Sequence, residues 1–540
     1  MYVKRFLIQP MNPLKKQSDN ENERVAKAAG VVGSATLLSR IFGFLRDVVI
    51  AGFFGAGLSS DAFFVAFRIP NLLRRLFAEG SLSVAFIPVF TDVLTNQGKD
   101  EAFEMARSAV RLLSVLLVVV AVAGILLSPL IIHIIAPGFA DSPEKMSITI
   151  FLTRIMFPYI FFIGMVALSM GILNVLGHFA APALAPVFLN LSIIASVFLI
   201  SPHMKDPVIS LAVGVVIGGI LQLALQIPFL INKGFYFWEK AKIFHPGLKK
   251  IGILMLPTIF GAAVYQINIL VGTLLASLLP QGSVSYLYYA DRLVQFPLGI
   301  FAIATATAVL PSISRQAAKK DLEAVRDTFS YAMKLVFFIT IPSMVGLIVL
   351  REPIVALLFK RGAFGEKATH LTAYALLYYS IGLWAFSAVR IVVSTFYALQ
   401  DTRTPVRMAV ISVFANAVLG IALMGPLGHG GLALATSLAS MLNLGLLVWA
   451  LRIKLGMLGL KTIIASTNKT ILCSVFMGVA VWATSLFIIP GEEGSLSGLF
   501  LGLAGSIGIG FLSYGLFSLL FKSQELEKVL AIARKGVGKA

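Results

Sequence analysis

Long apolar runs alternate with short polar turns along almost the whole chain. A run of about 18 or more apolar residues can cross a membrane as a helix. A window of about 19 residues predicts fourteen such spans. They lie near residues 29–56, 61–93, 108–136, 147–176, 181–201, 207–232, 249–279, 284–312, 329–350, 368–399, 404–424, 429–452, 465–489 and 494–521. The pattern therefore predicts an all-α polytopic membrane protein.

Composition supports the same class. Hydrophobic residues make up 58% of the 540 residues and charged residues only 13%, whereas a soluble protein has about 25% charged residues. Cys473 is the single cysteine, so no disulfide can form within one chain. The six histidines are scattered without the spacing of metal ligands. We find no nucleophile–base arrangement and no paired carboxylates, so we expect a transporter without catalytic residues, metal or cofactor.

The basic residues are unevenly distributed between the loops. With the N-terminus inside, most of the 44 Lys and Arg residues fall in the tails and loops of the cytoplasmic side. The positive-inside rule then places both termini in the cytoplasm, together with the basic loop 233–250. The net charge of +19 reflects this topology and attraction to anionic membrane lipids. No aromatic-rich basic module indicates nucleic-acid binding.

Three proline-containing segments recur in order after 223 or 224 residues. Pro88 corresponds to Pro311, Pro129 to Pro353 and Pro182 to Pro405. A duplication of six spans keeps both copies in the same orientation, as in transporters built from parallel repeats. We expect a cytoplasmic tail (1–28), a six-helix lobe (29–232), a cytoplasmic linker (233–248), a second six-helix lobe (249–452), two additional helices (453–521) and a cytoplasmic tail (522–540).

Charged residues inside the predicted spans concentrate in spans 1, 2 and 8. The cations are Arg40, Arg46, Arg68, Arg74, Arg75 and Arg292; the anions are Asp47, Asp61, Glu79 and Asp291. Ionisable groups inside a membrane normally face a cavity or each other. An excess of guanidinium groups favours a phosphate or diphosphate ligand, which they bind bidentately. The alternative is ion pairing that only stabilises the bundle, through Arg46–Asp47, Arg75–Glu79 and Asp291–Arg292.

Four motifs resemble those of a known family. They are "SRIFGFLRD" (39–47), "DAFFVAFRIPNLLRRLFAEG" (61–80), "GSVSYLYYADRLVQFPLGI" (282–300) and "FYALQDTRTP" (396–405). Together they resemble the signatures of the MurJ (MviN-type) lipid II flippases, within the superfamily of multidrug, oligosaccharidyl-lipid and polysaccharide exporters. The resemblance runs from about residue 30 to residue 455.

The resemblance implies fourteen spans in two lobes and a function in peptidoglycan synthesis. The substrate would be lipid II, an undecaprenyl-diphosphate-linked disaccharide-pentapeptide, flipped from the cytoplasmic to the outer leaflet of the inner membrane by alternating access. Helices 13 and 14 would form a groove for its lipid tail. Membrane lipids and cell-wall synthesis proteins are the other implied partners. The substrate-binding positions would be Ser39, Arg40, Arg46, Asp61, Arg74, Glu79, Ser285, Asp291 and Arg292, with Asp47 as a weaker candidate.

Some members of the family hold sodium with acidic residues in spans 7 and 11. Here the matching positions are Gly272 and Gly420, and only the neutral Asn268, Asn416 and Thr436 remain nearby in the sequence. We therefore expect no sodium site. Two alternatives stay open: a flippase for another polyprenyl-diphosphate-linked oligosaccharide, and a cation-coupled drug exporter of the same fold. The excess of arginine in the spans is the wrong sign for cationic drugs.

Overall fold

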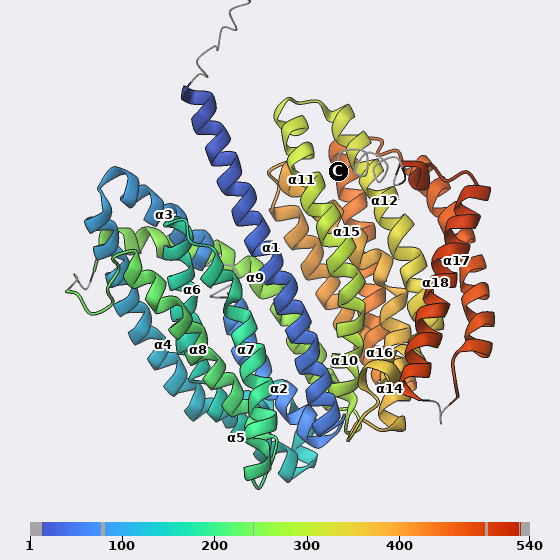
Figure 1. Ribbon diagram of the computed structural model, residues 1–540, viewed down its shortest axis with the longest axis horizontal. Coiled ribbons are helices and arrows are strands. Elements are labelled where there is room, and N and C mark those ends of the chain that lie inside the picture. Colours follow the sequence, from blue (N-terminus) through green and yellow to red (C-terminus); the bar gives the residue numbers. More distant parts are fainter. Residues whose placement is uncertain are drawn as a thin grey trace, which may run out of the picture. The chain divides into compact units, whose positions relative to one another are not determined.

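A computed structural model describes residues 13–76, 82–240, 242, 244–491, 495–528 and 530. Side chains are described for these residues apart from 13–29, 76, 257 and 260–262. Throughout the described residues the secondary structure is helical, without strands (Figure 1). This confirms the predicted all-α class. An apolar chain satisfies its backbone hydrogen bonds within each helix, which a membrane requires.

The helices of the first half are separated by short turns. They are α1 (Pro13–Phe54), α2 (Leu58–Leu76), α3 (Leu82–Asn96), α4 (Lys99–Ile135), the 3-10 helix η2 (Pro137–Asp141), α5 (Pro143–Met156), α6 (Tyr159–Val175), α7 (Ala180–Leu199), the 3-10 helix η3 (Ser201–His203), α8 (Ile209–Asn232) and α9 (Pro246–Ser277).

The remaining helices make up the second half of the described chain. They are α10 (Ser283–Pro297), the π-helical η4 (Leu298–Ala302), α11 (Ile303–Ala318), α12 (Leu322–Val349), α13 (Arg351–Phe359), α14 (Glu366–Ile381), α15 (Leu383–Ala398), α16 (Arg403–Leu455), α17 (Leu460–Ile488) and α18 (Leu496–Leu520).

Nine helices of the described part are long and apolar enough to cross a membrane, or ten if the bent pair α14–α15 counts as one span. This confirms a multi-spanning membrane protein, while the count of fourteen remains a prediction. Helices α1 and α2 are not among the nine. Each carries several of the charged residues noted above, and these lower its mean hydropathy.

Contacts divide the chain into two compact units. Unit 1 comprises residues 1–47, 70–126 and 154–259; unit 2 comprises 48–69, 127–153 and 260–540. The core of unit 1 joins α3, α4 and α6 around Phe86, Phe90 and Phe103. The core of unit 2 joins α12, α15 and α16 around residues such as Phe329 and Phe396. The units differ from the predicted lobes, because segments 48–69 and 127–153 group with the second half of the chain.

Several helix interruptions have a clear local cause. Gly428 lies inside α16 at φ 56° and ψ −135°, so the two predicted spans 404–424 and 429–452 form the two arms of one interrupted helix. Residues with a Cβ rarely adopt positive φ values. The pair α14–α15 bends by 43° at Gly382.

Helices α17 and α18 pack on each other and on α12 (Figure 1). The Tyr514 hydroxyl donates to the Phe338 carbonyl oxygen at 2.7 Å.

Asp401 of the "FYALQDTRTP" motif contacts both the beginning and the end of α16. The Asp401 carboxylate accepts hydrogen bonds from the Thr404 amide at 3.0 Å and the Thr404 hydroxyl at 2.6 Å. It also forms a close ion pair with Lys454, at the far end of α16. Burial alone would raise the pKa of Asp401, but the hydrogen bonds from Lys454 and Thr404 outweigh it and hold that pKa well below its usual range. Asp401 therefore joins the beginning of α16 to its end.

We expect Asp401→Asn to destabilise the protein by about 1–2 kcal/mol, because it weakens a helix cap and removes an ion pair. The measurement is thermal unfolding in detergent at neutral pH. Because the folded-state pKa is lowered, the difference from the parent chain should persist above the ordinary pKa of an aspartate. It should shrink as the pH falls through the lowered value.

Lys454→Met is the matched control. It keeps the hydrogen bonds that Asp401 accepts from Thr404 and removes only the partly exposed ammonium group. Its effect should be smaller than that of Asp401→Asn. An effect of Asp401→Asn that did not change between neutral and strongly acidic pH would contradict the assignment.

Candidate functional site

The first charged motif forms a buried cluster in unit 1. The Arg46 guanidinium contacts Asp47 Oδ1 through Nη2 at 2.7 Å and through Nε at 3.0 Å. Its Nη1 donates to Asn190 Oδ1 of α7 at 3.0 Å. The Asn190 amide in turn donates to the Ser39 carbonyl oxygen at 3.2 Å. Only 8% of Arg46 and 2% of Asp47 is exposed, so the cation is held in one orientation by charge and by a neutral amide.

Asn190 was not selected from the sequence. It is the one amide side chain of the largely apolar helix α7, and this was the available signal in the sequence. It lies against Gly43 of α1, where an added Cβ would make an ordinary contact with Asn190 Nδ2 at 3.4 Å. Asn190 therefore positions Arg46 and Ser39 relative to each other.

The other predicted residues of unit 1 have different surroundings. Arg40 is exposed on α1. Arg74 is partly buried, and its Nε and Nη2 donate to Asn71 Oδ1 at 3.2 and 3.0 Å, one turn earlier in α2. Glu79 lies outside the described residues, and so does the predicted pair Arg75–Glu79.

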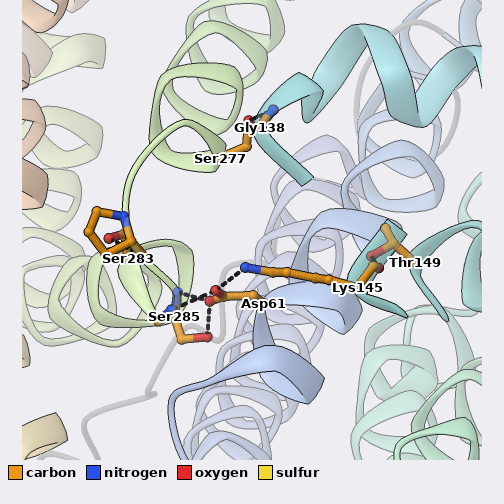
Figure 2. A network of polar contacts seen from close by, with 9 residues as sticks. Asp61, Gly138, Lys145, Thr149, Ser277, Ser283 and Ser285 are labelled. Carbon is orange, nitrogen blue, oxygen red and sulfur yellow. Dashed lines mark hydrogen bonds and ion pairs between the residues drawn. The ribbon is translucent and has the colours of Figure 1, made fainter. Parts of the chain in front are cut away.

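Asp61 lies at the centre of a second buried cluster, in unit 2 (Figure 2). The Lys145 ammonium group is 2.7 Å from Asp61 Oδ2, which also accepts from the Gly282 amide at 2.7 Å. Asp61 Oδ1 accepts from the Ser285 amide at 2.9 Å and from its hydroxyl at 2.6 Å. A negative charge at the N-terminus of α10 is also favoured by the helix dipole. The carboxylate is thus paired with one cation and accepts hydrogen bonds from the beginning of α10.

Lys145 was not among the predicted site residues, because it lies between the predicted spans 108–136 and 147–176, in a loop expected outside. In the structure its side chain is only 8% exposed. Its ammonium group lies 4.0 Å from the centroid of the Phe139 ring, a cation–π contact. Nearby, the Gly138 amide donates to Ser277 Oγ at 3.3 Å (Figure 2). The turn 136–142 is therefore packed against the end of α9, where an exposed loop was expected.

The eighth-span motif forms a third group, also in unit 2. Arg292 Nη2 donates to the Tyr288 hydroxyl at 2.9 Å, and its guanidinium lies 4.9 Å from the centroid of the Tyr288 ring. The Tyr288 ring also stacks on the ring of Phe64, with a distance of 3.8 Å between the ring centroids. Asp291 accepts a close hydrogen bond from Gln295. The Arg292 side chain is thus oriented by an aromatic residue one turn earlier in α10.

Arg68 of α2 belongs to the same group. It interacts electrostatically with Tyr288, Asp291 and Arg292. Its Nε is buried, with no hydrogen-bond partner among the described residues. Arg68 was recognised as a cation within a span, but it was not among the predicted substrate-binding positions.

The candidate sodium positions contain neutral groups. The Asn416 amide donates to Asn268 Oδ1 at 2.8 Å. A Cβ on Gly420 would lie 2.8 Å from a methyl group of Leu275, whereas Gly272 has open space beside it. In the described part of the chain, no group of three or more His, Cys, Asp or Glu side chains could hold a metal ion.

Comparison with known proteins places the sequence in a family. The family described as "Lipid II flippase MurJ" matches residues 50–522. The chain belongs to this family. It is 39% identical to the "Probable lipid II flippase MurJ" of Vibrio cholerae serotype O1, over 91% of this chain and 95% of the relative. It is 36% identical to the "Lipid II flippase MurJ" of Burkholderia cenocepacia, over 79% of this chain and 83% of the relative.

Solved structures agree with this assignment. A structure titled "Lipid II flippase MurJ, inward closed conformation" matches with a TM-score of 0.77 and 31% identity, covering 91% of this chain and 98% of that one. An inward-facing multidrug resistance MATE family transporter of the MOP superfamily matches with a TM-score of 0.65 and 17% identity, covering 80% of this chain and 99% of that one. The second likeness shows the shared fold alone. The resemblance seen in the four sequence motifs is confirmed, and the family is one of transporters.

We expect Asp61→Asn to destabilise the protein by roughly 3–5 kcal/mol, because it leaves the buried Lys145 ammonium group without a counter-charge. Lys145→Met should cost less, since Asp61 keeps the donors of Gly282 and Ser285. The measurement is the fraction of folded protein, by size-exclusion chromatography in detergent after heating.

The double variant Asp61→Asn/Lys145→Met should be more stable than Asp61→Asn alone, because no unpaired charge remains buried. A greater loss in Lys145→Met than in Asp61→Asn would show that the end of α10 does not hold the carboxylate.

Proposed function

We propose that this protein translocates lipid II, or a very similar polyprenyl-diphosphate-linked precursor, from the cytoplasmic to the outer leaflet of the inner membrane. The observation that carries the proposal is family membership over nearly the whole chain, with 39% identity to a relative named as a lipid II flippase. The excess of arginine in α1 and α2 supports an anionic substrate. A drug exporter for cations would need the opposite charge.

In this proposal the arginines bind the diphosphate. Arg46 is pre-oriented by Asp47 and Asn190, which lowers the entropic cost of binding an anion. Arg40 is exposed and supplies an accessible guanidinium. Arg74 and Arg292, with Ser39, Glu79 and Asp291, are the further substrate-binding candidates. Arg68 joins them, because its buried Nε carries an unused donor.

Asp61 and Ser285 have a different proposed role. Their hydrogen bonds are used within the protein, together with those of Lys145 and Gly282. In the predicted topology the turns beside these residues face outward. We infer that this network closes the outer side, and that it opens when the substrate is released by alternating access.

The finer architecture belongs to the same proposal. We infer fourteen spans in two six-helix lobes (29–232 and 249–452), joined by the linker (233–248), with both termini in the cytoplasm. The predicted lipid-tail groove (453–521) is supported by the apolar surfaces of α17 and α18, where large side chains such as Phe487 and Phe511 are exposed.

Depletion of this protein in its own cells should cause an undecaprenyl-diphosphate-linked disaccharide-pentapeptide to accumulate on the cytoplasmic face. Lipid-linked precursors would be extracted, identified by mass spectrometry, and tested for accessibility from outside the cell. Accumulation of a different polyprenyl-linked oligosaccharide would replace lipid II by that substrate, and unchanged precursor pools would overturn the proposal.

Replacing Arg40, Arg46, Arg74 or Arg292 by Ala, one at a time, should abolish complementation of a depleted strain while the protein still reaches the membrane. Lys should rescue only in part, because an ammonium group cannot form two parallel N–H···O bonds to a phosphate. Growth and the amount of protein in the membrane fraction are the measurements.

Arg315→Ala is the matched control. This arginine is exposed at the end of α11, and its loss should leave growth unchanged. If Asp291→Ala/Arg292→Ala restored the growth that Arg292→Ala alone had destroyed, Arg292 would serve an ion pair and its role in diphosphate binding would have to be abandoned.

A further inference from the structure

The linker (233–248) lies between two apolar helices, α8 and α9. In a chain that crosses the membrane repeatedly, a segment of this kind lies at the membrane surface. All the contacts that follow are within unit 1.

The linker backbone is fixed to the first half of α4. Arg107 forms a close ion pair with Glu239, and Arg111 Nη2 donates to the Glu239 carbonyl oxygen at 2.9 Å. The Ser108 hydroxyl donates to the Lys242 carbonyl oxygen at 2.6 Å. These hydrogen bonds attach the backbone at Glu239 and at Lys242 to α4.

Side chains of the linker also contact two acidic groups of α4. Lys242 Nζ lies 3.2 Å from Glu104 Oε1, and His245 Nε2 lies 2.9 Å from Glu101 Oε1. The hydrogen bond from Lys242 lowers the pKa of Glu104, so this carboxylate stays ionised and paired at neutral pH. Lys242 and Arg107 thus pair with two of the carboxylates near the linker, Glu104 and Glu239.

The aromatic residues of the linker point in two directions. Phe235 is buried in the core, where its ring meets Phe103 edge to face at 5.4 Å. Trp238 is 69% exposed and Phe244 is 75% exposed, and Tyr236 lies beside Trp238 at a ring distance of 5.4 Å. The described part of the linker thus exposes two large aromatic side chains.

Lysines surround these aromatic residues in the sequence and are exposed. Lys233, Lys240 and Lys249 are exposed, and Lys250 is 60% exposed although it contacts Asp92. Trp and Tyr are enriched where a membrane meets water, and lysines near that boundary are attracted to anionic headgroups. The combination has the chemistry of an anionic lipid surface.

We propose that Trp238 and Phe244, with Lys240 and Lys249, form a docking surface for anionic phospholipid at the membrane face beside α8 and α9. The aromatic rings insert at the level of the headgroups, and the ammonium groups contact the phosphates. In the predicted topology this is the inner leaflet. The surface shares no residue with the predicted substrate-binding positions, and the proposal does not depend on the substrate.

Trp238 provides its own probe. In the full chain with Trp384, Trp449 and Trp482 changed to Phe, the remaining tryptophan fluorescence of the chain comes from Trp238. The protein would be placed in nanodiscs that contain phosphatidylglycerol and phosphatidylcholine in equal amounts. In one preparation the phosphatidylglycerol is brominated near the carboxyl end of its acyl chains, and in the other the phosphatidylcholine is. We expect stronger quenching by brominated phosphatidylglycerol, with a preference on the order of fivefold for each contributing lysine.

Lys240→Gln/Lys249→Gln should reduce that preference towards one. Lys319→Gln/Lys320→Gln, in an exposed turn after α11, is the matched control and should leave it unchanged. If the three-Phe background does not fold, subtracting the signal of Trp238→Phe from that of the parent chain gives the same quantity.

Equal quenching by the two lipids, or no quenching by either, would overturn the proposal. Energy transfer between labels at position 238 of two chains that increased with protein density would also overturn it, because a second copy would then cover this surface.

Discussion

An ionised side chain buried in an apolar bundle must be surrounded by counter-charge or hydrogen-bond donors, and this constraint determines where the helices of this protein meet. Asp61 shows it most clearly, because its two oxygens accept from Lys145, Gly282 and Ser285. These residues come from α2, α5 and the beginning of α10. One carboxylate therefore fixes three segments that are far apart in the sequence.

The same constraint separates two kinds of charged residue. Asp61 is buried and its hydrogen bonds go to the protein, whereas Arg40 is exposed. A transporter needs both kinds, since buried pairs give the helices defined positions and accessible cations can exchange water for substrate. Asn190 joins α7 to α1 within unit 1, because it accepts from Arg46 and donates to the Ser39 carbonyl oxygen.

The sequence predicted the class of the fold and the family, because long apolar runs and specific motifs are local features. It also predicted a break between residues 424 and 429, where Gly428 lies, but not the π-helical residues Leu298–Ala302, since these depend on packing. Lys145 was missed because a lysine beside Asp141 and Glu144 has the pattern of an exposed loop. Asn190 was missed because a neutral amide carries no charge signal. The pairing of Asp61 with Ser285 required contacts across 224 residues, which no local pattern reports.

The partners of Asp61 are synthesised at different times. Lys145 follows Asp61 by 84 residues, whereas Ser285 follows it by 224. A chain that enters the membrane from its N-terminus therefore makes the ammonium group available long before the first turn of α10 exists. The carboxylate can be neutralised early, while the ribosome is still translating the second half. Helix α10 then arrives at a site that already carries a paired charge, and it has only to add its amides and one hydroxyl.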